Sequence, residues 1–362
     1  MMTNEKIEHP GKLLLSEINR IGMNQKELSV RTGMSEKHIS TVINGTKDIS
    51  SAFARRLDIA LGAPSGTWAK YQAEYDDYIA KLEELNGITD EEFSILKAMK
   101  DIVDYFLKNG IMHNHCGDTE KVIQLRQVLC VNNLTVIPKI TYSAAYRAQV
   151  KTSTNIDIYT LFAWQRMCEI ITDKVSVNAP FDKQKLVDNI PALKKIMFEK
   201  NPDKMVAELK RVFAECGIAF EVVRHFRGAP VQGFIKLTDT GRVILCLTIR
   251  GKSADKFWFS LFHEVGHLIN GDLNTRFVDF DSVKSEQESK ADQFARDTLI
   301  NPDMYKDLIA SYRYHSLNDI KSFSAFIGVP HWITIGRLHK DEWLDWSRYA
   351  HEAPSFEWED DE

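Results

Sequence analysis

The chain has 362 residues, of which 44% are hydrophobic and 27% are charged, and its formal net charge is -5. This length predicts two or three domains, and the composition is ordinary for a soluble globular protein. The negative charge excludes a polybasic nucleic-acid binder, although a local basic face remains compatible with it.

Membrane insertion and export are not expected either. No apolar run reaches the roughly 20 residues that a membrane-spanning helix needs, and the first residues, "MMTNEKIEHPGK", contain no apolar signal region. The five cysteines are scattered, without a Cys-x-x-Cys pair, which favours reduced thiols in a cytoplasmic protein. "HNHC" (His113, His115, Cys116) has metal-binding side chains, but without a second half-site a polar turn is the expected structure.

Residues 11–61 have the pattern of short helices separated by turns. In "NQKELSVRTG", Asn24 precedes Glu27 by three residues, the spacing of a capping box. In "MSEKHISTVING", Ser35 is the expected N-cap and Gly45 the end. Two short helices joined by a tight turn predict a helix-turn-helix, whose second helix enters the major groove of DNA. The expected DNA contacts are Gln25, Glu36, Lys37, His38, Ser40, Thr41, Asn44 and Lys47.

The charge of this segment does not decide between DNA and a protein partner, because residues 1–61 hold nine Lys and Arg against seven Asp and Glu. A resemblance favours DNA. The run from "HPGKLLLSEINRIG" to "ARRLDIALG", followed by "TWAKYQAEYD", resembles the helix-turn-helix of the HigA-type antitoxins within the XRE repressors. This resemblance implies DNA binding, with homodimers on palindromic operator sites.

The middle of the chain is expected to be mostly helical. A helix from Thr67 to about Leu85 has an aromatic stripe, which is typical of a core or a dimer surface. Its members are Trp68, Tyr71, Tyr75, Tyr78 and Leu82. One helix is expected over 90–107, an irregular segment over 108–155, and three amphipathic helices within 160–171, 181–198 and 202–217.

From Gly217 the pattern changes from helix to strand. "IAFEVVRH", "VQGFIKL" and "RVILCLTIR" predict three strands. We expect "VILCLTIR" at the edge of the sheet, where a peptide substrate could add by backbone pairing. The next helix, "SADKFWFSLFHEVGHLIN", contains His-Glu-x-x-His, and three strands followed by such a helix is the order of a zincin peptidase.

The spacing of this motif suits a metal ion. His263 and His267 lie one helical turn apart, so both imidazoles can bind one Zn²⁺. Glu264 can reach a water on the metal and act as the catalytic base. Asn270 and Leu273 stand where the metzincin pattern has Gly and His, which excludes that class.

A glutamate on the following helix is the expected third ligand. Glu288 lies on the face of "SEQESKADQFARDTLINP" that Ala291 and Ala295 define as buried, whereas Glu286, the competing ligand, lies half a turn away. Asp292 is one turn after Glu288, where it could accept a hydrogen bond from a ligand histidine.

The stretch from about Phe181 to Tyr349 resembles the ImmA/IrrE metallopeptidase family. The pieces that carry the resemblance are "VQGFIKL", "DKFWFSLFHEVGH", "ESKADQFARDTLINPDMY" and "FIGVPHWITIGRLH". It implies a zinc site with His263, His267 and Glu288 as ligands and Glu264 as base. The chain departs from the family's usual Glu-x-Glu-Ala-Asn by having Lys290 and Asp292. The transition-state stabiliser is not apparent: His331 is the first candidate, and His315 and Tyr312 are others, each more typical of a structural or surface residue.

The expected fold class is therefore α+β, mostly α, with a small sheet in the metallopeptidase part. The expected domains are a helix-turn-helix at 1–66, a linker or dimerisation helix at 67–87, a helical middle region at 88–180, a metallopeptidase domain at 181–349 and an acidic tail at 350–362, with "FEWEDDE" disordered.

The expected function is an antitoxin-like transcription regulator that carries a zinc metallo-endopeptidase. It would repress its own operon and control a partner toxin or repressor by binding or proteolysis, including cleavage of its own chain within about 86–160. Two alternatives stay open: an antitoxin whose zinc domain is a docking or sensing scaffold, and a peptidase whose N-terminal domain binds protein. The expected partners are operator DNA, the toxin or repressor and a second copy, with no membrane.

Overall fold

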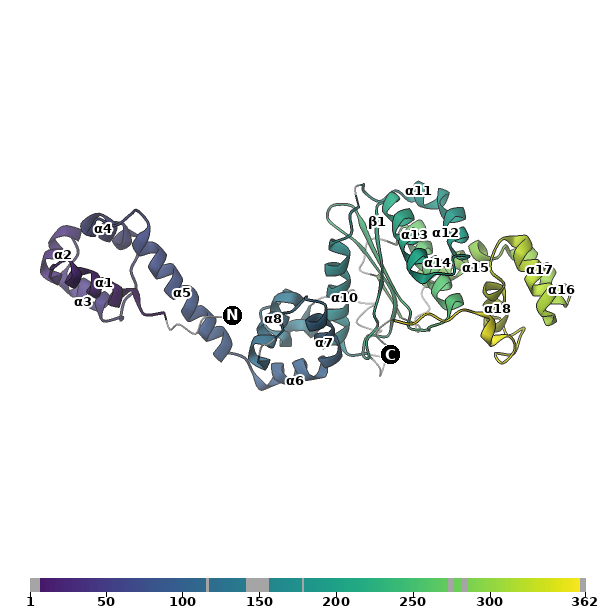
Figure 1. The fold of residues 1–362 in the computed structure, drawn as a ribbon, viewed down its shortest axis with the longest axis horizontal. Coiled ribbons are helices and arrows are strands. Elements are labelled where there is room, and N and C mark those ends of the chain that lie inside the picture. Colours follow the sequence, from purple (N-terminus) through teal and green to yellow (C-terminus); the bar gives the residue numbers. More distant parts are fainter. Residues whose placement is uncertain are drawn as a thin grey trace. The chain divides into compact units, whose positions relative to one another are not determined.

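The computed structural model describes residues 7–114, 117–140, 156–177, 179–272, 277–280 and 286–358. The chain divides into two compact units, one formed by Met1–Phe93 with Gly117–Ile123 and the other by Ser94–Cys116 with Gln124–Glu362. Helices dominate and one four-stranded sheet is present among the described residues, so the predicted class, α+β and mostly α, is confirmed (Figure 1). No helix in these described ranges combines the length and apolarity that a bilayer crossing needs.

The first unit begins with five helices. They are α1 (Pro10–Arg20), α2 (Gln25–Thr32), α3 (Glu36–Ile43), α4 (Ser51–Leu61) and α5 (Thr67–Asn86). The predicted caps hold α2 and α3 in place: Asn24 accepts a hydrogen bond from the backbone of Glu27 at 2.8 Å, and Ser35 accepts one from His38 at 3.2 Å. Gly33 ends α2 with a φ of 66°, in the left-handed region. The buried residues of this core include Leu14, Ile18, Leu28, Ile39, Val42, Phe53, Leu57 and Trp68.

Two predictions for the middle region are wrong. The single helix expected over 90–107 is two helices, α6 (Asp90–Ala98) and α7 (Lys100–Lys108), which part at the buried Met99. No glycine or proline marks this break in the sequence. The segment expected to be irregular contains α8 (Asp118–Leu129) and the 3₁₀ helix η1 (Leu134–Lys139).

The second unit is built around the sheet. Its strands are β1 (Ile218–Val223), β2 (Val231–Leu237), β3 (Val243–Thr248) and β4 (Phe277–Phe280), in the order β1-β3-β2-β4. β1 is parallel to β3, while β2 is antiparallel to both β3 and β4. β3 is thus central and buried at every position, so the prediction that "VILCLTIR" forms an edge strand is wrong. A continuous apolar run is typical of a strand covered on both faces.

Helices cover both faces of the sheet (Figure 1). On one face, α10 (Ile158–Asp173) contacts β1 and β3, and Trp164 lies edge-on to Phe234 with ring centroids 6.1 Å apart. On the other face, Phe220 and Ile235 join the core formed by α12 (Ile190–Ile196), α13 (Pro202–Glu215) and α14 (Ala254–Asn270). The single helix expected over 181–198 is interrupted between α11 (Lys183–Asp188) and α12, because Pro191 fits only the first turn of a helix.

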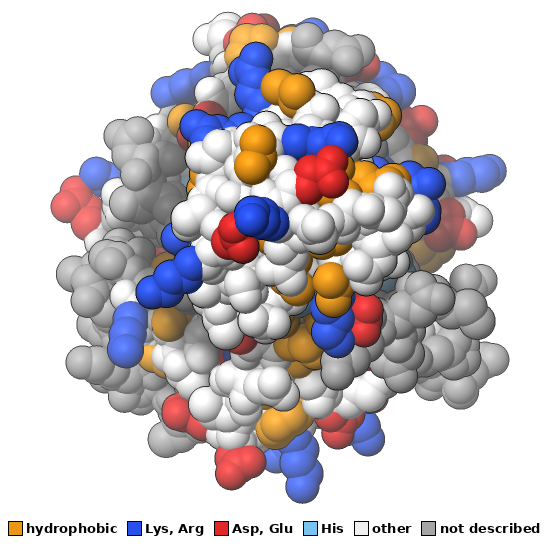
Figure 2. Space-filling model, turned by 90° about the vertical axis from the view of Figure 1, so that its left-hand side faces the viewer, with side chains coloured by type: hydrophobic (Ala, Val, Ile, Leu, Met, Phe, Trp, Pro, Cys, Tyr) orange, Lys and Arg blue, Asp and Glu red, His pale blue; other side chains and the backbone are white. Residues whose placement is uncertain are grey.

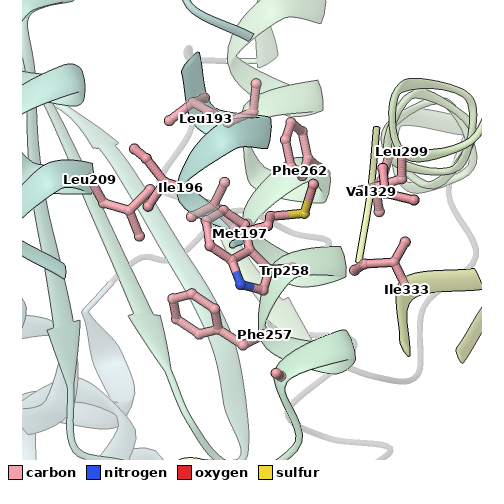
Figure 3. Packing of buried hydrophobic residues seen from close by; sticks show 14 of the residues in the cluster. Leu193, Ile196, Met197, Leu209, Phe257, Trp258, Phe262, Leu299, Val329 and Ile333 are labelled. Carbon is pink, nitrogen blue, oxygen red and sulfur yellow. The ribbon is translucent and has the colours of Figure 1, made fainter. Parts of the chain in front are cut away.

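The aromatic run of α14 supplies three large buried side chains to this core. Phe257, Trp258 and Phe262 lie in one buried cluster with Leu193 and Met197, and Figure 3 shows Met197 beside Trp258. They anchor the side of α14 that faces away from solvent, so the helix has little freedom to turn about its axis. The predicted burial of this run is confirmed.

Further helices complete the second unit. They are α15 (Glu286–Leu299), α16 (Pro302–Ala310), α17 (Leu317–Ile327) and α18 (His331–Lys340), with the 3₁₀ turns η3 (Arg313–His315) and η4 (Ala350–Glu352). The segment after η4 is ordered: Phe356 lies edge-on to Phe257, with ring centroids 5.5 Å apart, and Glu357 pairs with Lys252 at 3.1 Å. The prediction of disorder for "FEWEDDE" is therefore wrong for 356–358, and 359–362 lie outside the described residues.

Candidate metal centre

Two histidines of α14 present their Nε2 atoms to the same point. His263 and His267 are both buried, and their Nε2 atoms are 3.1 Å apart. This follows from the helix, because residues four apart stack one turn above another. Polar side chains this deeply buried need partners, and each imidazole has them on both ring nitrogens.

Glu288 completes the group from the first turn of α15. Its Oε2 is 3.1 Å from His263 Nε2 and its Oε1 is 3.6 Å from His267 Nε2. α14 and α15 can approach this closely because Gly266 has no side chain: a Cβ there would lie 3.1 Å from the Cα atom of Ala291. Glu286, the competing ligand, is exposed and pairs with Lys290 at 2.8 Å.

Two aspartates hold the outer nitrogens of the histidines. Asp292 Oδ1 is 2.9 Å from His263 Nδ1, and Asp272 Oδ2 is 3.0 Å from His267 Nδ1. When Nδ1–H donates to a carboxylate, the lone pair of Nε2 is free to bind a metal ion. Asp272, which the sequence analysis missed, follows the helix-ending Gly271. Its position just after the second histidine was the available signal.

The trio has the geometry of a metal site. Its ligand atoms lie within 4.8 Å of one another, and among the described residues it is the group of His, Cys, Asp and Glu that could hold an ion. Ligands about 2.0–2.1 Å from a tetrahedral metal are roughly 3.3 Å apart, close to the separations of 3.1 to 3.6 Å found here. Two imidazoles and one carboxylate suit zinc and leave a fourth position for substrate or water.

The carboxylates of this centre favour a positive charge beside them, on a histidine or on a bound cation. Burial opposes the ionisation of Glu288, but hydrogen bonds from His263 and His267 outweigh it and lower the pKa of the carboxyl to about 2. Burial likewise opposes protonation of His267, but Glu288, Glu264 and Asp272 together raise the pKa of the imidazole. A metal ion would supply the positive charge that these carboxylates attract.

Glu264 lies inside the protein beside the trio. Its side chain is 1% exposed. The carboxylate reaches β2, where a Cβ added to Gly233 would lie 1.9 Å from Glu264 Oε1. The side chain thus extends from α14 toward the sheet, and it is close enough to His267 to contribute to the raised pKa of that imidazole.

The three histidine and tyrosine candidates for a transition-state stabiliser have partners elsewhere. His331 begins α18, and its Nε2 is 2.7 Å from Glu352 Oε2. The His315 ring lies 4.3 Å from that of Tyr314. Tyr312 is 70% exposed. These contacts belong to the C-terminal helices and give no geometric support to an oxyanion role.

Some predictions fall on residues outside the described ranges. Leu273, used with Asn270 against the metzincin class, is one of them. So are His115 and Cys116 of the "HNHC" stretch, and residues 141–155 of the expected irregular segment and cleavage region. His113 is described, and its backbone donates to Gln124 Oε1 at 2.6 Å.

The predicted DNA contacts divide into exposed and packed residues. Glu36, Lys37, Asn44 and Lys47 are exposed, while Gln25, His38, Ser40 and Thr41 are half-buried. The His38 ring lies edge-on to Phe53, and burial lowers the pKa of the imidazole. The Thr41 hydroxyl donates to the backbone of His38 at 2.7 Å. Figure 2 shows Lys and Arg side chains spread over the face turned to the viewer, with Asp and Glu among them.

Comparisons with known proteins add little to this geometry. No protein-family model matches the chain, and no curated protein does. Among solved structures, a candidate antidote protein of a plasmid maintenance system from Nostoc punctiforme is similar to part of it. The two are 28% identical over 22% of this chain and 87% of that one, with a TM-score of 0.21. The residues of the site therefore carry the functional argument.

Proposed function

We propose that this protein is an antitoxin-like DNA-binding regulator with a zinc-dependent metallo-endopeptidase centre. The observation that carries the enzymatic half is the meeting of His263, His267 and Glu288 with Glu264 buried beside them. These are the groups that zinc peptidases use as ligands and base. The DNA-binding half rests on the capped helices α2 and α3 with exposed polar residues on α3.

Each residue of the site would have a separate role in peptide hydrolysis. Zinc, when bound, would polarise the peptide carbonyl and lower the pKa of water to about 7. His263 and His267 would hold it through Nε2, because Asp292 and Asp272 accept their Nδ1 hydrogens. Glu264 would take a proton from the attacking water at its carboxylate and pass it to the leaving amine.

Peptide hydrolysis by the full-length, zinc-loaded protein tests this half. Glu264→Gln should abolish hydrolysis and keep zinc, while His263→Ala should lose both. Glu288→Gln should weaken zinc binding, and Glu286→Gln, an exposed neighbour on the same helix, is its matched control. Fragments of the protein itself, cut by wild type but not by Glu264→Gln, would identify self-cleavage.

The scaffold alternative has its own outcome in the same experiment. If Glu264→Gln still neutralises a partner toxin as wild type does, hydrolysis is dispensable and the centre serves docking or sensing. If wild type binds zinc but cleaves no peptide, partner or linker, the peptidase proposal fails.

Binding to the protein's own promoter tests the DNA half. Lys37 and Ser40 lie on α3, so Lys37→Ala with Ser40→Ala should weaken binding to the operator and reduce its salt dependence. Lys200→Ala, an exposed lysine of the second unit, is the control. Unchanged affinity of the double variant in a fluorescence anisotropy titration would contradict recognition through α3.

We assign the expected homodimer contact to α5. Trp68 and Gln72 are buried, whereas Tyr71 and Leu82 are 38% and 37% exposed. One row of α5 repeats with the 3–4 spacing of a coiled-coil seam, through Tyr71, Tyr75, Tyr78, Leu82 and Leu85, and within it Tyr75 also packs edge-on against His9. In an antiparallel pair of α5 helices, Glu74 of one copy would face Lys81 of the other. Leu82→Glu should give monomers in sedimentation experiments, and a dimer that survives this change would refute the assignment.

A further inference from the structure

The carboxylate of Glu264 rests against a position of β2 that has no side chain. Gly233 lies in the middle of β2, opposite Leu247 of β3. A Cβ on Gly233 would lie 1.9 Å from Glu264 Oε1, 2.4 Å from its Cδ and 2.8 Å from its Cγ. Outside its own residue and the two chain neighbours, a real Cβ atom essentially never has a heavy atom within 3.0 Å. Any residue other than glycine therefore forces the carboxylate or the strand to move.

Backbone conformation does not account for this glycine. Gly233 lies within an irregularity of the β2–β4 pairing between Val231 and Phe234, but it is absent from the residues with positive φ, so its φ does not require glycine. Glycine in a paired strand costs stability, because it has more freedom to lose and no side chain to pack. The next residues, Phe234 and Ile235, are large and buried. The space that a side chain would occupy at this position is filled by Glu264.

We propose that Gly233 is a positioning residue for Glu264. The bare backbone of β2 admits the carboxylate between the strand and α14 and fixes it beside the metal ligands. The inference rests on the proposed function, because it gives Gly233 a part in the same reaction. Because Glu264 is 1% exposed and α14 is anchored by its aromatic residues, moving the carboxylate away from β2 requires the buried side chains around it to adjust.

A Cβ at this position would displace the base and spare the ligands. Its nearest atoms all belong to the end of Glu264, and none belongs to His263, His267 or Glu288. Gly233→Ala should therefore lower kcat for peptide hydrolysis roughly 10- to 100-fold, since a misplacement of about 1 Å has effects of this size. KM and zinc affinity should stay within about threefold of wild type.

A shorter carboxylate side chain at position 264 should compensate for the Cβ added at position 233. Glu264→Asp removes one methylene, so it should lower kcat in the wild-type background and raise it in the Gly233→Ala background. A general loss of packing would not produce this change of sign. Gly117→Ala is the matched control, because a Cβ there meets nothing within 4 Å and the φ is not positive, so kcat should be unchanged. An unchanged kcat in Gly233→Ala, or a parallel loss of zinc affinity, would overturn the proposal.

Thermal unfolding of the metal-free, full-length protein tests the contact without any substrate. Gly233→Ala should lower Tm by roughly 3–8 °C, and by less than half as much when Glu264→Ala has removed the carboxylate. Equal shifts in the two backgrounds would overturn the proposal even in an active peptidase. Coupled shifts in a protein that hydrolyses nothing would instead uphold the contact and refute the proposed function.

Discussion

Replacing Asp272 by Asn tests whether the outer carboxylates set the affinity for zinc. Asp272 accepts from His267 Nδ1 at 3.0 Å and from Gln287 Nε2 at 3.1 Å, and its side chain is 12% exposed. Asp292, its counterpart on His263, is 48% exposed, so water can more easily replace it. Loss of such a partner weakens metal binding about 10- to 100-fold, or roughly 1.4–2.7 kcal/mol. We expect Asp272→Asn near the upper end of this range and Asp292→Asn near the lower end.

Competition with a chromophoric zinc chelator at neutral pH measures the difference directly. Asp303→Asn is a suitable control, because this aspartate is 88% exposed and pairs only locally with Lys306. The reasoning would be refuted if Asp292→Asn lost as much affinity as Asp272→Asn, or if neither variant differed from the control.

Three other predictions concern pH, metal removal and packing. Zinc affinity should fall as pH falls through the raised pKa of His267, because zinc binds the neutral imidazole while Glu288, with a pKa of about 2, stays ionised. In the metal-free protein, stability changes with pH in the opposite direction. The stability that His267 contributes is present below its unfolded pKa, about 6.5, and is lost as pH rises through its higher folded pKa. Calorimetry across pH measures both the zinc affinity and the unfolding. Chelation should lower the stability of the zinc-loaded protein by about 4 kcal/mol at a free zinc concentration 1,000 times Kd, and should leave the Tm of His263→Ala unchanged. Trp258→Ala should cost about 3–5 kcal/mol in urea unfolding, because this side chain is 1% exposed, while Trp346→Ala, at 57%, should cost less than about 1 kcal/mol.

The parts of the structure that local spacing determines could be predicted from the sequence. Asn24 and Ser35 as caps follow from a side chain reaching the backbone three residues on. The meeting of His263 and His267 follows from one helical turn. Glu288 rather than Glu286 follows from which side of α15 is apolar, since Ala291 and Ala295 are fully buried.

What depends on distant partners could not be predicted. β4 is four residues long and pairs with β2, from which it is separated by two other elements of the fold. The break at Met99 has no local signal, because it is a buried residue that leaves the helical geometry. The place of β3 is different, because its unbroken apolar run is itself typical of a central strand covered on both faces, so the sequence contained the signal that the edge prediction contradicted.

The residues around the metal centre are close together in the sequence. His263 and Asp292, at the two ends of the group, are 29 positions apart, and the remaining ligands and Asp272 lie between them. Closing a loop of this length costs about as much entropy as pairing β1 with β3, because the paired residues Ile218 and Val243 are themselves 25 positions apart. Zinc binding could therefore join α14 to α15 at a stage as early as the pairing of β1 with β3, so the ion would also take part in the folding of the second unit.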